Sequence, residues 1–398
     1  MTKRRKILAN TALILASTVV AFLLLEAAAR LVLRYGNDPE RFLTYASARQ
    51  LRMHPEFTQP YMRFQAHRYL GYIPTPNFRR HTLTHNALGY KDDEIVLPKP
   101  DGEFRIVCMG GSTTYTTIVG DTALSYPNLL EQDLHDRGLA HVNVVNAGVD
   151  GYTSYETLIN YAFRVQDLEP DMLIIMDGLN DTYARIVWPP EAFKGDNSGF
   201  RAPLFDSVIM PSVLEYSTLL RVVLIKAGLA ESHFGLRTMY DLAATDSFYG
   251  AEWERQQATG TYPDGIFKQV DLARMLDECG PQFFIRNIEN VIAMAKYHGI
   301  EVVLLSTPWA RADTARPGDR PILSNPACVS ALEDAARRME TLAHDTGCLW
   351  FDLAQRFPDD PDCYVDGVHM NIDGARIKAN LIADFLLDSH PLGPHTTP

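Results

Sequence analysis

The sequence predicts an α/β protein with a doubly wound parallel sheet of five strands. Short, almost uninterrupted apolar runs alternate with longer segments of helical periodicity, which is the pattern of βαβ units. The apolar runs lack the polar alternation of half-exposed strands, so both faces of the sheet are expected to be covered. An N-terminal transmembrane helix and a large insertion after the third strand are expected in addition.

The five strands are expected at short apolar runs that end in turn residues. These runs lie at residues 105–109, 142–145, 172–177, 302–306 and 349–352. The segments between them have helical patterns, so we expect the flavodoxin-like strand order 2-1-3-4-5. Parallel sheets of this kind bind ligands beyond the carboxyl ends of their strands, and functional side chains are therefore expected at that edge.

The helices of the core are expected between the strands, at residues 126–136, 153–166, 283–298, 327–345 and 373–388. In the third of these, Phe284, Ile288 and Val291 recur at helical spacing. At the start of the second, Thr153 is followed three residues later by Glu156, which is the sequence of a capping box. Local sequence therefore agrees with the alternation of strands and helices.

The N-terminus combines a basic cluster with a long apolar segment. Four basic residues at positions 3 to 6 precede nineteen uncharged residues, Ile7 to Leu25. Roughly twenty apolar residues cross a bilayer, and a basic flank stays in the cytoplasm. We therefore expect an uncleaved signal-anchor in the inner membrane, with the rest of the chain in the periplasm. The alternative is secretion after cleavage of a signal peptide, for which residues 27–29, all alanine, resemble a cleavage site.

We expect four parts along the chain. They are a basic tail with the anchor helix (1–34), an extension that packs on the core (35–103), the α/β domain (104–390) and a disordered tail (391–398). Within the α/β domain, residues 182–282 exceed what a minimal core needs. Long insertions of this kind are usually functional. This one follows the third strand, so we expect it to form a lid over the ligand-binding edge.

Composition excludes some functions. A net charge of −12 gives no positively charged surface for nucleic acid. The five cysteines show no spacing typical of a metal site. We expect Cys108, inside the first strand, to be a buried free thiol. An oxidising compartment would allow pairing among the other four, although their spacing indicates no particular pairs: Cys279, Cys328, Cys348 and Cys363.

Four short polar motifs stand where the strands end or where the last helix begins. They read Gly-Gly-Ser at 110–112, Asn-Ala-Gly-Val-Asp-Gly at 146–151, Gly-Leu-Asn-Asp at 178–181 and Asp-Gly-Val-His at 366–369. The glycines allow a sharp turn that leaves the serine open to a ligand. A serine hydroxyl becomes a good nucleophile when a base takes its proton, and the histidine motif supplies a base.

In this order, the four motifs resemble those of the SGNH (GDSL-like) hydrolase family over residues 105–369. The resemblance implies that Ser112 is the nucleophile, His369 the general base and Asp366 the residue that orients the histidine. It further implies an oxyanion hole formed by the backbone N–H groups of Ser112 and Gly151 and the side-chain amide of Asn180. No metal or cofactor is implied.

The first motif departs from the family pattern. Gly111 stands where the family name records Asp, which removes a hydrogen-bonding group beside the serine, and Thr113 stands in place of Leu. The order Ser, Asp, His also occurs in α/β-hydrolases, but those have Gly-x-Ser-x-Gly and a distant Asp. Here Thr114 occupies the second glycine position, and the Asp is three residues from the His. The SGNH pattern therefore fits better.

The resemblance implies hydrolysis of an ester through a seryl acyl-enzyme. An exported location favours an acylated glycan or lipid of the cell envelope as substrate. Tyr183, Arg185 and Trp188 begin the insertion and are candidates for substrate contact. The runner-up is an O-acyltransferase that uses the same Ser-His-Asp site. The alternative from another class is a non-catalytic envelope protein that binds glycans or acts as a scaffold.

Overall fold

The computed structural model describes residues 3–36, 38–53, 63–67, 69–186, 193, 195, 216–230, 272–311, 316, 319, 321–389 and 392. Most of the predicted lid, Trp188 within it, and most of the predicted disordered tail lie outside these residues. The described residues belong to two compact units. One contains helices of the N-terminal region and of the insertion, and the other contains the sheet.

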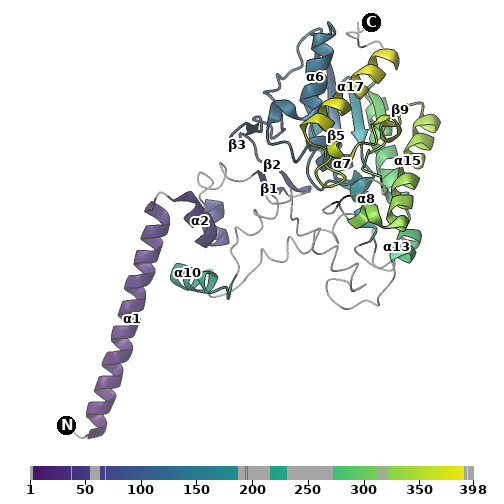
Figure 1. Ribbon diagram of the computed structural model, residues 1–398. Coiled ribbons are helices and arrows are strands. Elements are labelled where there is room, and N and C mark those ends of the chain that lie inside the picture. Colours follow the sequence, from purple (N-terminus) through teal and green to yellow (C-terminus); the bar gives the residue numbers. More distant parts are fainter. Residues whose placement is uncertain are drawn as a thin grey trace. The chain divides into compact units, whose positions relative to one another are not determined.

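The predicted α/β fold is confirmed in the second unit (Figure 1). Its parallel sheet consists of β5 (Phe104–Gly110), β6 (Val142–Asn146), β7 (Met172–Met176), β8 (Glu301–Leu305) and β9 (Leu349–Phe351). The strands lie in the order β6-β5-β7-β8-β9, which is 2-1-3-4-5 when they are numbered along the chain. β5 is therefore an interior strand next to the edge strand β6, and it pairs with β6 on one side and β7 on the other.

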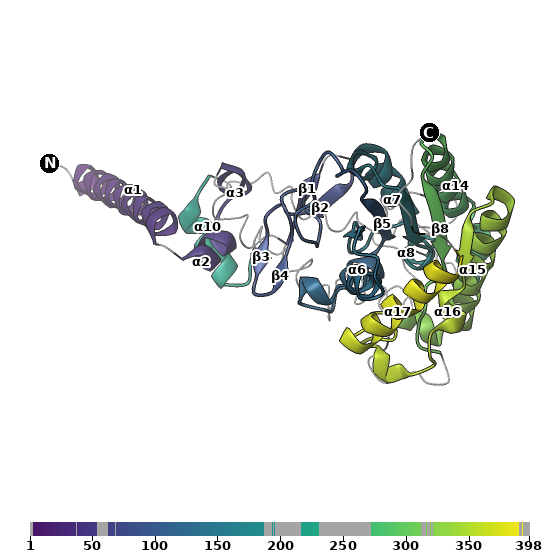
Figure 2. The same ribbon diagram turned by 90° about the horizontal axis from the view of Figure 1, so that it is seen from above.

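Helices cover both faces of the sheet. Alternate strand residues such as Ile106 and Val144 pack against α6 (Tyr126–Asp136) and α17 (Ile372–Ser389). The intervening residues pack against helices on the other face, where α14 (Gln282–Tyr297) and α15 (Pro326–Thr346) lie with α7 (Ser154–Asn160). Figure 2 shows α6 and α17 on one side of the sheet and α7 and α14 on the other. Burial on both faces explains why the strand sequences are mostly apolar and lack a polar alternation.

Four of the five predicted helices match α6, α14, α15 and α17 within one residue at each end, and one predicted helix differs. The segment expected at 153–166 is α7, capped by the predicted Thr153–Glu156 box, and it continues through a π-helical segment and a 3₁₀ turn to Leu168. The remaining helical segments of this unit are α5 (Ser112–Tyr115), η2 (Thr122–Leu124), α8 (Leu179–Ala184), α13 (Leu272–Glu278), η6 (Pro321–Ser324), α16 (Leu353–Arg356) and η7 (Pro361–Cys363). All five cysteines have free thiols.

The extension before the core forms two small antiparallel hairpins. β1 (Phe64–His67) pairs with β2 (Gly71–Pro74), and β3 (Arg79–Arg80) pairs with β4 (Leu83–Thr84). The first hairpin shares a buried aromatic cluster with the core, made of Phe64, Leu70, Tyr72, Ile73, Tyr115, Val149 and Tyr152. The described extension from residue 63 onward is thus part of the sheet unit.

The other unit contains α1 (Lys3–Tyr35), α2 (Pro39–Tyr45), α3 (Ala48–Met53) and α10 (Thr218–Lys226). By length and composition, α1 is a helix that could cross a membrane. Near its end, the Glu26 carboxylate accepts hydrogen bonds from the backbone N–H groups of Thr218 and Leu219, each at 2.9 Å. Glu26 thereby caps the first turn of α10.

Candidate active site

Ser112 lies just after the end of the interior strand β5. β5 ends at Gly110, and Ser112 is the first residue of the short helix α5, where it remains partly exposed. Steric crowding explains why residue 111, between them, is glycine. A Cβ atom at Gly111 would lie 2.5 Å from the Asn180 side-chain nitrogen and 3.1 Å from the Tyr152 carbonyl oxygen. The Asp that the family name records would not fit here without movement of these groups.

His369 and Asp366 lie together in a closed loop before α17. An antiparallel bridge joins Tyr364 to Met370, and the Val365 N–H donates to the His369 carbonyl at 2.8 Å. One oxygen of the Asp366 carboxylate, Oδ1, accepts from the backbone N–H groups of Val368 at 3.2 Å and His369 at 2.8 Å. The carboxylate therefore fixes the loop and leaves its second oxygen, Oδ2, facing the imidazole.

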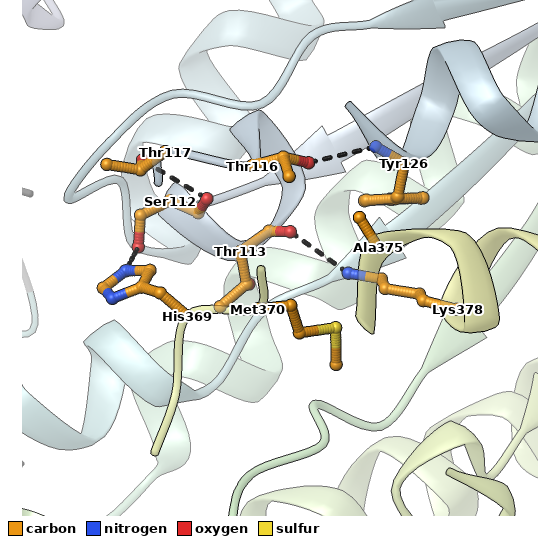
Figure 3. A pocket seen from close by; sticks show the side chains of 9 residues that line it. All are labelled: Ser112, Thr113, Thr116, Thr117, Tyr126, His369, Met370, Ala375 and Lys378. Atoms are coloured by element: carbon orange, nitrogen blue, oxygen red, sulfur yellow. Dashed lines mark hydrogen bonds between the residues drawn. The ribbon is translucent and has the colours of Figure 1, made fainter. Parts of the chain in front are cut away.

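The loop places a hydrogen-bonded relay at Ser112, and Figure 3 shows the bond between Ser112 and His369. His369 Nδ1 lies 2.8 Å from Asp366 Oδ2, and His369 Nε2 lies 2.7 Å from Ser112 Oγ. An ionised carboxylate only accepts hydrogen bonds. Nδ1 must therefore carry the proton, and Nε2 is left with a lone pair toward the serine hydroxyl. This is the tautomer that a general base needs.

The other predicted residues come from the loops after β6 and β7. Gly151 has a positive φ of 70°, which favours glycine. Asn180 lies in the first turn of α8 and donates one amide N–H to the Tyr152 carbonyl at 2.8 Å. This bond fixes the orientation of the amide, whose nitrogen carries a second N–H. The structure thus brings the loop of Gly151 and the side chain of Asn180 to the turn that carries Ser112.

Comparison with known proteins identifies the family. The sequence model of the GDSL-like lipase/acylhydrolase family matches residues 108–377, which is more than half of the chain. The chain belongs to this family. It is therefore a hydrolase that acts on ester bonds. No curated protein matches the chain.

Solved structures with a similar arrangement come from several bacteria. A GDSL-like lipase from Bacteroides thetaiotaomicron is 17% identical with a TM-score of 0.38, and the match covers 72% of this chain and 88% of that one. A lipase/acylhydrolase from Enterococcus faecalis is 16% identical with a TM-score of 0.40, covering 74% and 100%. A catalytic mutant of an acetylxylan esterase from Geobacillus stearothermophilus is 13% identical with a TM-score of 0.40, covering 74% and 98%. The family assignment depends on the sequence match and not on these structures.

In this hydrolase, two of the three predicted substrate contacts are buried. Tyr183 packs in an apolar cluster with Leu179 and Met275. The Arg185 guanidinium donates to the carbonyl oxygens of Leu276 and Cys279, and burial lowers its pKa. These contacts anchor the C-terminal end of α13 to α8. Contact with substrate stays a prediction for both residues, and Trp188 lies outside the described residues.

Asp181, next to Asn180, has a structural partner. Its carboxylate accepts from the Ser154 hydroxyl at 2.5 Å and from the Ser154 N–H, so it ties α8 to the start of α7. Burial raises the pKa of Asp181 to about 6. Asn287 of α14 donates to the same hydroxyl at 3.1 Å. These hydrogen bonds fix the segment that carries Asn180 to α7 and α14.

One residue near the site was not predicted. Lys378 of α17 is buried, and its ammonium group donates to the Thr113 carbonyl at 3.1 Å and lies 3.7 Å from the centre of the Tyr126 ring (Figure 3). Burial lowers its pKa well below the usual value. The sequence contains a signal for this position, because Ala375, Lys378 and Ala379 share the apolar face of the helix.

The small pocket beside Ser112 is formed by residues of these same segments. Its lining consists of Ser112, Thr113, Thr116, Thr117, Tyr126, His369, Met370, Ala375 and Lys378. Within the described ranges, no group of three or more His, Cys, Asp or Glu side chains is arranged to hold a metal ion.

Proposed function

We propose that the protein is a serine esterase that works through a seryl acyl-enzyme. The observation that supports this most directly is the relay from Ser112 Oγ through the His369 ring to Asp366, with distances of 2.7 Å and 2.8 Å. In the acylation step, Nε2 takes the hydroxyl proton as Oγ attacks the ester carbonyl. The Asp366 carboxylate stabilises the imidazolium that forms.

Negative charge develops on the carbonyl oxygen during attack. We assign its stabilisation to the backbone N–H groups of Ser112 and Gly151 and to the second N–H of the Asn180 amide. Three observations support this assignment: Ser112 is at the first position of α5, Gly151 follows β6, and the Asn180 amide approaches Gly111 closely. Fixed donors of this kind usually provide the largest part of catalysis in acyl transfer.

Collapse of the tetrahedral intermediate completes the first half of the reaction. His369 returns its proton to the leaving alcohol oxygen, and the acyl group stays on Ser112. Water then attacks the acyl-enzyme with His369 again as base, which releases the carboxylic acid and regenerates the serine. A sugar hydroxyl in place of this water would give the O-acyltransferase reaction.

We further propose that the enzyme is anchored in the inner membrane and acts in the periplasm. α1 has the length and composition of a membrane span, and apolar side chains such as Leu13 and Leu15 are more than 60% exposed. The basic residues at its start favour a cytoplasmic N-terminus. This location supports an O-acyl ester of an envelope glycan or lipid, such as an acetylated sugar, as the substrate.

The function is tested with the full-length protein in detergent and p-nitrophenyl acetate as substrate, beside the Ser112→Ala variant. The proposal predicts steady release of acetate that depends on Ser112. A burst followed by slow turnover, which a sugar acceptor accelerates, would indicate the acyltransferase. A folded protein without any Ser112-dependent reaction would contradict both and favour the non-catalytic alternative. Release of acetate from O-acetylated glycans and of fatty acid from lipids then separates the substrate classes.

Membrane topology has its own test. In spheroplasts of a bacterial host, added protease should digest the sheet unit while a fragment that contains α1 stays in the membrane. A protein that is released into the medium with a new N-terminus near residue 30 would show cleavage instead.

A further inference from the structure

The extension before the core makes direct contact with the loop of Gly151. Arg63 precedes β1, and its guanidinium Nη2 donates to the Asp150 carboxylate at 2.9 Å. The side chains are only 5% and 7% exposed. The two residues are 87 positions apart in the sequence. Because a buried charge is costly without a partner, this pair specifies one position of the extension on the loop.

Asp150 also connects this loop to the turn of Ser112. The Thr117 hydroxyl donates to the second carboxylate oxygen of Asp150. The Thr117 N–H in turn donates to the Ser112 carbonyl at 3.1 Å. Through one buried carboxylate, the extension, the Gly151 loop and the serine turn are therefore held together.

Tyr72 of β2 contacts the backbone of the loop itself. Its hydroxyl donates to the carbonyl oxygen of Asp150. A Cβ atom at Gly151 would lie 2.8 Å from the same hydroxyl oxygen, so a larger residue there would displace the Tyr72 hydroxyl. The Tyr152 hydroxyl of the loop donates in turn to the Tyr72 carbonyl of β2 at 2.6 Å, so β2 and the loop are joined by a second hydrogen bond.

The carbonyl of Asp150 and the N–H of Gly151 belong to one peptide unit. This unit is planar, and in the trans form the C=O and the N–H point in opposite directions. A hydrogen bond that fixes the carbonyl therefore also fixes the direction of the Gly151 N–H. Donation to the carbonyl polarises the peptide, which makes the N–H a stronger donor.

A second layer of hydrogen bonds holds Arg63. Its Nε donates to the Tyr115 hydroxyl at 3.2 Å, and the Tyr115 oxygen lies 2.6 Å from His85 Nε2. His85 Nδ1 lies 3.0 Å from the Thr75 carbonyl, which only accepts, so Nδ1 carries the proton and Nε2 accepts from Tyr115. Every member of this chain is buried.

We propose that Tyr72 and Arg63 are positioning residues for the oxyanion hole, and that the N-terminal extension is thus part of the active site. This inference rests on the proposed role of the Gly151 N–H. Both residues lie outside the region that the family model matches, residues 108–377. The extension therefore adds hydrogen bonds to the family core that orient the Gly151 N–H toward the reacting carbonyl.

The test uses Tyr72→Phe in the full-length protein, with Tyr161→Phe as the control. Both changes delete a buried hydroxyl and keep the ring. Tyr161 belongs to the apolar cluster that α14 and α15 form with the sheet, not to the cluster of Tyr72. Its hydroxyl has no hydrogen-bond partner among the described residues. With p-nitrophenyl acetate, Tyr72→Phe should lower kcat roughly tenfold or more with little change in KM, because misdirection weakens a donor that acts in the transition state. The control should match the wild type.

A second measurement judges the inference independently of activity. Hydrogen–deuterium exchange in peptides that cover residues 148–153 should be faster in Tyr72→Phe and unchanged in Tyr161→Phe. Wild-type kcat in Tyr72→Phe, in a protein whose turnover depends on Ser112, would overturn the inference. If the wild type shows no Ser112-dependent turnover, the proposed function fails, and unchanged exchange in Tyr72→Phe would then overturn the positioning of the loop as well.

Arg63 provides a matched pair of variants. Arg63→Lys keeps the charge beside Asp150, whereas Arg63→Met removes it. For variants of equal thermal stability, we expect kcat to fall at least tenfold in Arg63→Met and to stay close to the wild-type value in Arg63→Lys. Equal kcat in the two variants would count against a role of the ion pair in positioning.

Discussion

Replacement of Asp366 by asparagine tests the proton relay with a minimal change of shape. Asp366 Oδ1 accepts from two backbone N–H groups, and Oδ2 accepts from His369 Nδ1. In Asp366→Asn, the amide oxygen can keep both backbone bonds only if the NH₂ group faces the imidazole. An NH₂ group donates, so it selects the histidine tautomer with the proton on Nε2. That tautomer cannot take the proton of Ser112.

The expected loss follows from this tautomer. The equivalent change in a serine protease lowers kcat by about 10⁴, which corresponds to roughly 5 kcal/mol of transition-state stabilisation. Thermal stability should stay near that of the wild type because the loop retains its backbone bonds. Asp366→Ala should lose similar activity and, in addition, roughly 2–4 kcal/mol of folding free energy, since the buried N–H groups of Val368 and His369 lose their acceptor.

The assay is hydrolysis of p-nitrophenyl acetate with circular dichroism melting of the same samples. An Asp366→Asn protein within tenfold of wild-type kcat would refute the argument from the tautomer. An Asp366→Asn protein that melts as early as Asp366→Ala would refute the argument from the backbone bonds.

Three further predictions use the same assays. Asn180→Ala should lower kcat roughly a hundred- to a thousandfold with little change in KM, whereas a change in KM alone would make Asn180 a binding residue. Lys378→Met should lower kcat by about tenfold, because the turn after Ser112 loses the bond to the Thr113 carbonyl; unchanged kcat would leave Lys378 with a packing role. Burial lowers the pKa of His85 to about 3, and the nearby positive charges of Arg63 and Lys91 act in the same direction. Since the unfolded value is near 6.5, the neutral His85 stabilises the fold above that pH, and this contribution is lost as the pH falls toward 3, by on the order of a few kcal/mol. Urea unfolding at pH 7 and pH 5 should show a smaller loss in His85→Gln than in the wild type.

The sequence predicts the sheet well because its strands are buried on both faces. Such strands are mostly apolar runs bounded by turn residues, so the run at 105–109 corresponds to β5 within one residue at each end. Helix limits are also accurate where a cap or a long apolar face marks them, as in α6 and α15. The short helix α8 has too few residues for periodicity and could not be predicted.

The candidate site is predictable where its residues lie in contiguous motifs. Asp366 and His369 are three residues apart, and local bonds in their loop bring them together. Contacts between distant segments leave no such pattern. Nothing in the sequence pairs Arg63 with Asp150, or marks Lys378 as a partner of Thr113, because these bonds depend on the folded arrangement. The catalytic roles themselves stay predictions until they are measured.

The most direct test of the central claim is the site of covalent modification. The full-length protein would be treated with a fluorophosphonate, digested and mapped by peptide mass spectrometry, beside Ser112→Ala and His369→Ala. We expect one modified residue, Ser112, no modification in Ser112→Ala and strongly slowed labelling in His369→Ala. Labelling of another serine, or equal labelling of the folded Ser112→Ala protein, would contradict Ser112 as the nucleophile.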